Sequence, residues 1–196
     1  KLPVSSLMRC IWAWHREKYK KRAQLVYAKQ FYINEREEKN MNGVVGTNLV
    51  CQVGFIVKDI QATKKKWAEF LGVEEPEANL CGEYEIMQTQ FMGAPAPEAN
   101  SYLAFFDVGP GLQLELIQPN EASSTWRNYL NEHGEGIHHV AFNIQGMKMP
   151  EAVKRCEDFG MTLEQKGEYG DASGRYVYMN AYKDLKCIVE LLESDK

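Results

Sequence analysis

Hydrophobic and polar positions recur in the same order twice between residues 47 and 193. The first pass opens with a β-branched run at 48–57, which predicts a strand. Apolar residues at helical spacing over 60–71 then predict a helix, with Asp59 as its N-cap and Gly72 just past its end. Three further strand-like stretches follow, at 84–89, 102–108 and 112–118.

The second pass repeats this order. A strand-like stretch at 137–144 precedes a helix that begins near Pro150 and ends at Gly160. The strands predicted after it are 162–165, 175–180 and 187–192. Each half is therefore one βαβββ module, which is an α+β organisation. We expect module one at 47–118, a linker helix at 119–136 and module two at 137–193.

Residues 1–40 have a different character from the rest of the chain. They contain no glycine and predict a helical extension, with a domain boundary near residue 41. They hold 10 Lys and Arg against 4 Asp and Glu, whereas residues 41–196 hold 13 against 23. An acidic body argues against nucleic-acid binding. The basic run at 16–22 is expected to be a solvated helix face, and the alternative is a contact with a partner.

Composition limits the class of protein further. With 44% apolar residues in 196, the chain can bury a core, and no stretch approaches the roughly 18 consecutive apolar residues that span a bilayer. Its five cysteines are scattered, odd in number and form no C-x-x-C pair. This pattern favours a reducing compartment, and we expect a cytoplasmic protein without membrane contacts.

Overlaying the two halves aligns polar residues of ligand type. Gln52 falls against His139, and Glu115 falls against Glu190. Both glutamates are flanked by aliphatic residues. If both faces of their strands are buried, a carboxylate there would cost several kcal/mol of folding free energy, unless it is ion-paired or binds a metal. An imidazole, two carboxylates and an amide oxygen suit a divalent ion. A lone strand glutamate ordinarily faces solvent, and His138 is expected to point to the opposite face of its strand from His139.

These residues lie in motifs that together resemble the vicinal oxygen chelate superfamily, which includes glyoxalase I and methylmalonyl-CoA epimerase. The resemblance covers residues 47–193 and rests on QVGFIVKDI at 52–60, LELI at 114–117, GIHHVAF at 136–142 and IVEL at 188–191. It implies a cupped mixed sheet around a divalent metal. The implied ligands are Gln52, Glu115, His139 and Glu190, a set similar to that of zinc-type glyoxalase I, with nickel, cobalt or manganese as alternatives.

The resemblance also implies a lyase or isomerase that shuttles a proton next to a metal-chelated carbonyl through an enediolate or enolate. Glu190 would be the base, and Glu115 a ligand and second base. A glyoxalase I-type reaction is the principal hypothesis, although the arginine that glutathione-dependent relatives place before the metal histidine is missing. Methylmalonyl-CoA epimerase-type racemisation of an acyl-CoA is the alternative, although residues 101–108 lack the catalytic glutamate of those enzymes.

The substrate is expected to be a small thioester or hemithioacetal. Arg127 and Arg175 are candidates for contact with its anionic groups, and Tyr102, Trp126 and Tyr178 for its apolar part. The Pro-containing segment 92–100 could close as a lid. A homodimer is expected.

Two other function classes stay open at this stage. A ring-cleaving dioxygenase on this fold would need a two-histidine, one-carboxylate iron triad, and Gln52 stands where one histidine is required. A metal-free binding or resistance protein would have lost its ligands, whereas all four positions carry coordinating side chains.

Overall fold

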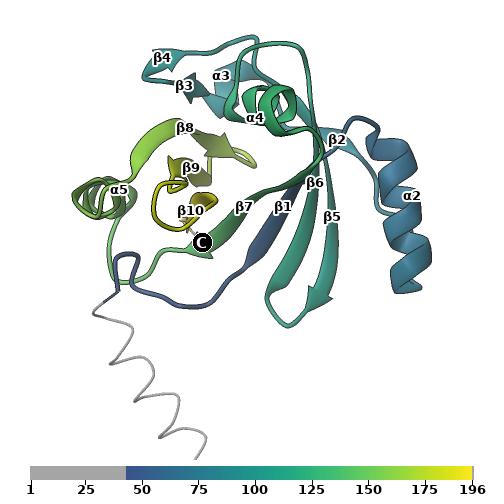
Figure 1. Ribbon diagram of the computed structural model, residues 1–196, viewed down its shortest axis with the longest axis horizontal. Coiled ribbons are helices and arrows are strands. Elements are labelled where there is room, and N and C mark those ends of the chain that lie inside the picture. Colours follow the sequence, from purple (N-terminus) through teal and green to yellow (C-terminus); the bar gives the residue numbers. More distant parts are fainter. Residues whose placement is uncertain (1–42, 196) are drawn as a thin grey trace, which may run out of the picture. The chain divides into compact units, whose positions relative to one another are not determined.

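A single curled sheet of ten strands organises the chain in the computed structural model, which describes residues 43–195 (Figure 1). The predicted extension at 1–40 lies outside the described residues. Neighbouring strands follow the order β2-β5-β6-β1-β7-β10-β9-β8-β3-β4. The strands are β1 (Gln52–Ile56), β2 (Asn79–Leu80), β3 (Gln90–Phe91), β4 (Ala94–Pro95), β5 (Ser101–Gly109), β6 (Leu112–Pro119), β7 (Gly136–Asn143), β8 (Thr162–Tyr169), β9 (Gly174–Asn180) and β10 (Ile188–Ser194). The helices are α2 (Ile60–Leu71), α3 (Tyr84–Met87), α4 (Thr125–His133) and α5 (Met149–Asp158).

The two modules join inside one chain through β1 and β7. These strands pair antiparallel, and each also pairs in parallel with the last strand of its own module, β1 with β6 and β7 with β10. Gly54 lies opposite Glu115 on one side and His139 on the other. Ala141 lies opposite Gln52 and Glu190. This register agrees with the overlay of the two sequence halves and confirms the α+β fold of paired modules.

Helices α2 and α5 cover the outer faces of the two modules (Figure 1). On the α2 side, Phe55 packs against Trp67 with ring centroids 5.7 Å apart. On the α5 side, Cys156 is buried against Val189 and Leu191. A third cluster fills the inner side of the curl around Trp126 of α4. Because side chains alternate along a strand, every residue between two outward-facing ones is directed into the curl.

The helix ends follow the local chemistry that the sequence predicts. The Asp59 carboxylate accepts a hydrogen bond from the Ala62 amide at the start of α2. Gly72 ends that helix with φ 69°, a conformation that glycine adopts without steric cost. Pro150 lies in the first turn of α5, where its missing N–H costs nothing. The boundaries predicted for α2 are confirmed, whereas α5 starts near the predicted position and ends at Asp158, before the predicted Gly160.

The connection between α2 and β5 differs from the prediction. Residues 84–89 alternate like a strand, but Tyr84–Met87 form the short helix α3. The Gln88 side-chain amide donates to the carbonyls of Tyr84 and Glu85 and closes this turn, which alternation alone does not reveal. Part of the expected loop at 92–100 is also ordered, because β3 and β4 form a hairpin whose first strand pairs with β8.

None of the helices formed by residues 43–195 is long and apolar enough to cross a membrane.

A buried carboxylate at the start of α5 makes folding sensitive to acid. Glu193 accepts a hydrogen bond from the Met149 amide at 2.8 Å and pairs with Lys148 at 2.8 Å. Burial alone would raise the pKa of Glu193, but these partners and Arg175 outweigh burial and lower it. A lowered folded-state pKa stabilises the fold above the unfolded-state value and loses that effect as the pH falls through the folded-state value.

We therefore expect Glu193→Gln to lower the free energy of unfolding at pH 7 by about 1–2 kcal/mol. The difference from the wild-type protein should shrink as the pH falls below the unfolded-state pKa of about 4.3 toward the lowered folded-state pKa of Glu193. Urea unfolding followed by circular dichroism at pH 7 and pH 3 measures it. An equal difference at both pH values would show that the charge of Glu193 does not contribute.

Candidate metal centre

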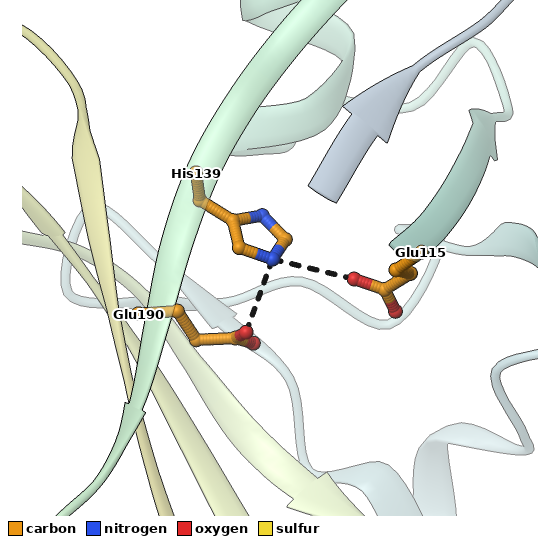
Figure 2. Close-up of side chains that lie close together, drawn as sticks. All are labelled: Glu115, His139 and Glu190. Atoms are coloured by element: carbon orange, nitrogen blue, oxygen red, sulfur yellow. Dashed lines mark ion pairs between the residues drawn. The ribbon is translucent and has the colours of Figure 1, made fainter. Parts of the chain in front are cut away.

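Two carboxylates and one imidazole converge inside the curl of the sheet. Glu115 comes from β6, His139 from β7 and Glu190 from β10, and their side chains point toward one another (Figure 2). His139 Nε2 lies 3.4 Å from Glu115 Oε2 and 3.1 Å from Glu190 Oε2. One ligand atom from each residue lies within 4.8 Å of the others, and all three residues are buried. The structure thus brings together three of the four predicted ligands.

Gly54 makes this convergence possible. It lies on β1 between Glu115 and His139, and a Cβ added at Gly54 would overlap the imidazole ring of His139. The ring therefore lies directly over the glycine backbone. Only a residue without a side chain leaves room for it, so Gly54 is a necessary part of the site that sequence analysis did not identify.

The fourth predicted ligand, Gln52, lies on the same face of β1 as Gly54. It is buried and lines a large cavity together with Glu115 and Glu190. The cavity has a volume of about 810 Å³ and extends over the inner side of β1, β5, β6, β9 and β10. Its walls include five aromatic side chains, those of Phe105, Trp126, Tyr169, Tyr176 and Tyr178, among aliphatic and polar ones. This size and lining fit a small organic ligand.

Burial sets the electrostatics of the cluster. Burial raises the pKa of Glu115. Burial alone would lower the pKa of His139, but the adjacent carboxylates of Glu190 and Glu115 outweigh it and raise the pKa to about 9. Two buried carboxylates around one imidazole leave an excess of negative charge, and uncompensated buried charge costs several kcal/mol.

The donor set fits a divalent cation. Glu115 Oε2, His139 Nε2 and Glu190 Oε2 are buried and have no hydrogen-bond partner outside the cluster. Buried polar atoms without a partner are rare, and here the three belong to one cluster and face one point. One imidazole nitrogen with carboxylate oxygens suits zinc and similar divalent ions. The residues present therefore fit a metal in this position.

Comparison with known proteins identifies the family. Residues 51–179 match the family model described as the Glyoxalase/Bleomycin resistance protein/Dioxygenase superfamily. The chain belongs to this superfamily. The resemblance to vicinal oxygen chelate proteins is thereby confirmed. No curated protein sequence matches the chain.

Solved structures with the superfamily fold also match, at low sequence identity. Methylmalonyl-CoA epimerase from Mycobacterium tuberculosis has a TM-score of 0.52 at 18% identity, over 78% of this chain and 91% of that one. A variant of the Streptomyces coelicolor epimerase in complex with 2-nitronate-propionyl-CoA has a TM-score of 0.52 at 18% identity, over 74% and 94%. A hypothetical protein from Bacillus halodurans has a TM-score of 0.51 at 18% identity, over 76% and 95%. At this identity the likeness shows the fold.

His138 does not point away from His139, so that expectation was wrong. The register between β1 and β7 shifts after Gly54, because Phe55 pairs with Ile137 and leaves His138 as the extra residue of a β-bulge. A bulge redirects a side chain. The two Nδ1 atoms lie 3.1 Å apart, and both rings pack against Tyr178. Nothing in the order of apolar and polar residues indicates this bulge.

Of the five predicted substrate contacts, Trp126 and Tyr178 line the cavity. Tyr102 lies on β5 and is 43% exposed, outside the cavity lining. The Arg127 guanidinium bonds the carbonyls of Pro119 and Asn120 and the Glu121 carboxylate. The Arg175 guanidinium pairs with three carboxylates, those of Glu168, Glu193 and Asp195. Both arginines therefore hold parts of the chain itself, and no residue of 92–100 lines the cavity.

The contact between Gly54 and His139 can be tested by adding one methyl group. We expect Gly54→Ala to push the His139 ring away from the carboxylates, to cost about 1–3 kcal/mol of unfolding free energy by overpacking and to weaken zinc binding by about tenfold or more. Isothermal titration calorimetry with zinc measures the second effect.

Ala141→Gly is the matched control, because Ala141 takes the corresponding place opposite Gln52 in the other module. Removing its methyl group should cost only about 0.5–1 kcal/mol and leave zinc affinity unchanged. Equal zinc affinities in Gly54→Ala and the wild-type protein would contradict the close-approach account.

Proposed function

We propose that this protein is a metal-dependent enzyme that moves a proton on a carbon next to a carbonyl group, a reaction of the lyase or isomerase class. The observation that supports it most directly is the buried cluster of Glu115, His139 and Glu190 on the wall of an 810 Å³ cavity. A purely structural ion cluster has no need to border a cavity large enough for a substrate.

Gln52, Glu115, His139 and Glu190 are the proposed ligands. Zinc is the proposed metal, with nickel, cobalt and manganese as the other ions that such a donor set takes. Gln52 is included because it shares the face of β1 that borders the cluster and lines the same cavity. When bound, the cation would polarise the carbonyl oxygen of the substrate and stabilise the negative charge that develops there.

Glu190 is the proposed base. Its carboxylate lies in the cluster and also lines the cavity, so it can reach a substrate proton from the metal side. It would take the proton from the carbon next to the carbonyl and return it to a neighbouring carbon or to the other face of the same carbon. Glu115 lies across His139 from Glu190 and is the proposed second carboxylate, as ligand and base.

The aromatic wall supports this chemistry by excluding water. Burial, with Glu190 and Glu115 nearby, raises the pKa of Tyr178 well above the ordinary value, so its phenol stays neutral and does not compete as a base. Trp126 packs edge-on against Tyr178 with ring centroids 6.0 Å apart. An apolar wall beside the carboxylates strengthens electrostatic interactions at the reacting atoms.

The cavity restricts which end of a substrate it can hold. Among residues 43–195, those that line it include no Lys or Arg. An anionic group inside it would find no basic side chain there. The reacting end of the substrate should therefore be uncharged, with phosphates or carboxylates left outside. A hemithioacetal or a thioester presents such an end.

Glyoxalase I-type conversion of a hemithioacetal is the principal proposal. Epimerase-type racemisation of an acyl-CoA is the second candidate, favoured by the fold that the chain shares with methylmalonyl-CoA epimerases. Chelated and zinc-reloaded protein should be assayed on methylglyoxal–thiol hemithioacetals and on acyl-CoA thioesters. Incorporation of deuterium from solvent at the carbon next to the carbonyl reports the proposed step on either substrate. Protein that binds no zinc would instead support a metal-free binding function.

Replacing the base should remove turnover while leaving the fold intact. We expect Glu190→Gln to reduce kcat by about 10²–10⁴-fold, because the amide cannot take up the proton. Turnover of the zinc-loaded variant and its deuterium incorporation measure this.

Glu193→Gln is the control on the same strand, since Glu193 lies on the opposite face of β10 and contacts the start of α5. Its kcat should stay within about twofold of the wild-type value, as expected for a site outside the cavity. An active Glu190→Gln enzyme would refute the assignment of the base.

A further inference from the structure

We propose that Glu164, Thr125 and His138 form a hydrogen-bonded relay that determines which nitrogen of His139 is free to bind the cation. This inference rests on the proposed function, because it concerns one of the proposed metal ligands. The relay runs from β8 through the first turn of α4 to β7. All its links are direct contacts between side chains of the described residues.

The contacts form one continuous chain. The Thr125 hydroxyl donates to Glu164 Oε2 at 2.7 Å and lies 3.2 Å from His138 Nε2. His138 Nδ1 lies 3.1 Å from His139 Nδ1. The other oxygen of Glu164 accepts from the Asn180 amide at 2.7 Å, which holds the carboxylate in place. His138 and His139 have no exposed surface, and Thr125 is 2% exposed.

Both ends of the relay come from β-bulges. His138 is the extra residue where the pairing of β1 with β7 shifts. Glu164 is the extra residue between Leu163 and Gln165, where the pairing of β8 with β9 shifts. Bulges next to functional sites commonly redirect a side chain. Two bulges on separate strands here direct their side chains to the Thr125 hydroxyl. Each bulge disrupts the pairing of its strand, and a contact that only stabilises the fold does not need either of them.

The number of available protons fixes the direction of each bond. A hydroxyl has one hydrogen, and Thr125 gives it to the Glu164 carboxylate, which can only accept. Thr125 must therefore accept from His138, so His138 carries its proton on Nε2. A second proton on Nδ1 would make His138 a buried cation with no carboxylate in contact, which burial disfavours. The hydrogen between the two Nδ1 atoms thus belongs to His139.

This assignment decides how His139 meets the metal. With its Nδ1 proton held by His138, His139 keeps that proton and directs Nε2 to Glu115 and Glu190. Nε2 is then the nitrogen whose lone pair a cation can use. Groups that hold the second nitrogen of a metal-bound histidine fix both its protonation pattern and its ring orientation. Glu164, Thr125 and His138 are positioning residues in this sense.

Glu164→Gln tests the relay because glutamine keeps the shape of the side chain but reverses the donor–acceptor direction of the hydrogen bonds from residue 164 to His138. The glutamine oxygen would still accept from Asn180, so its NH₂ group would donate to Thr125. Thr125 would then donate to His138 Nε2 and place the His138 proton on Nδ1, facing His139. The Nδ1 proton of His139 would lose its acceptor. We expect the His138 proton to move from Nε2 to Nδ1 and zinc affinity to fall by about 10–100-fold.

Two measurements read the result. Long-range ¹H–¹⁵N NMR of histidine-labelled, metal-free protein identifies the protonated nitrogen of His138, and competition with a chelator gives the zinc affinity. Glu168→Gln is the matched control, because it removes the same charge from the same strand outside the relay. It should change neither readout. Thr125→Ser should keep the wild-type pattern and affinity, whereas Thr125→Val should lose both.

A wild-type His138 protonated on Nδ1 would overturn the proposal. So would an unchanged tautomer in Glu164→Gln, or a changed tautomer with zinc affinity equal to that of the wild-type protein. Wild-type protein that bound no zinc would refute the proposed function instead, and the position of the His138 proton would still decide whether the relay exists.

Discussion

Two carboxylates buried around one imidazole are the constraint on which the rest of the site depends. Glu115 and Glu190 reach His139 from strands of different modules, and the facing polar atoms of all three residues are shielded from solvent without a hydrogen-bond partner outside the cluster. Such burial costs several kcal/mol per uncompensated charge. A divalent cation bound there would offset that cost, and the cluster borders a cavity large enough for a small ligand.

The pairing of β1 with β7 carries the geometry that this cluster requires. Duplicated modules place equivalent residues symmetrically about the seam, so Gly54 opposes His139 as Ala141 opposes Gln52. The two positions differ because an imidazole needs the space of a missing side chain, whereas glutamine leaves room for a methyl group. The symmetry of the fold is thus broken at one residue, Gly54, which faces the imidazole of the proposed ligand His139.

The sequence predicted most of this arrangement from periodicity. The duplicated order of elements, the ends of α2 and the hairpin of β5 with β6 followed from alternation and capping residues. The candidate ligands came from the overlay of the halves together with the resemblance to the vicinal oxygen chelate superfamily. Helix ends and the hairpin are encoded by neighbouring residues, and the order of elements occurs twice in the sequence, so one sequence is enough to predict them. Glu115, His139 and Glu190 converge because each lies on the same face of the sheet. A shift of the register by one residue would have turned a side chain to the other face.

What escaped prediction depends on contacts between distant segments. The bulges at His138 and Glu164 leave no trace in the polar pattern, and the close approach at Gly54 is visible only once β7 is placed beside β1. Arg127 and Arg175 were predicted to contact anionic groups of the substrate. In the structure their partners are carbonyls and carboxylates of the chain itself. Whether a surface cation is already paired is a tertiary property.

The most direct test of the account is a crystal structure of zinc-soaked protein with anomalous diffraction measured at the zinc edge. We expect one strong anomalous peak, with zinc about 2.0–2.2 Å from His139 Nε2 and from one carboxylate oxygen each of Glu115 and Glu190. Zinc bound elsewhere, with His139 still paired directly to the two carboxylates, would contradict the claim that this cluster is a metal centre.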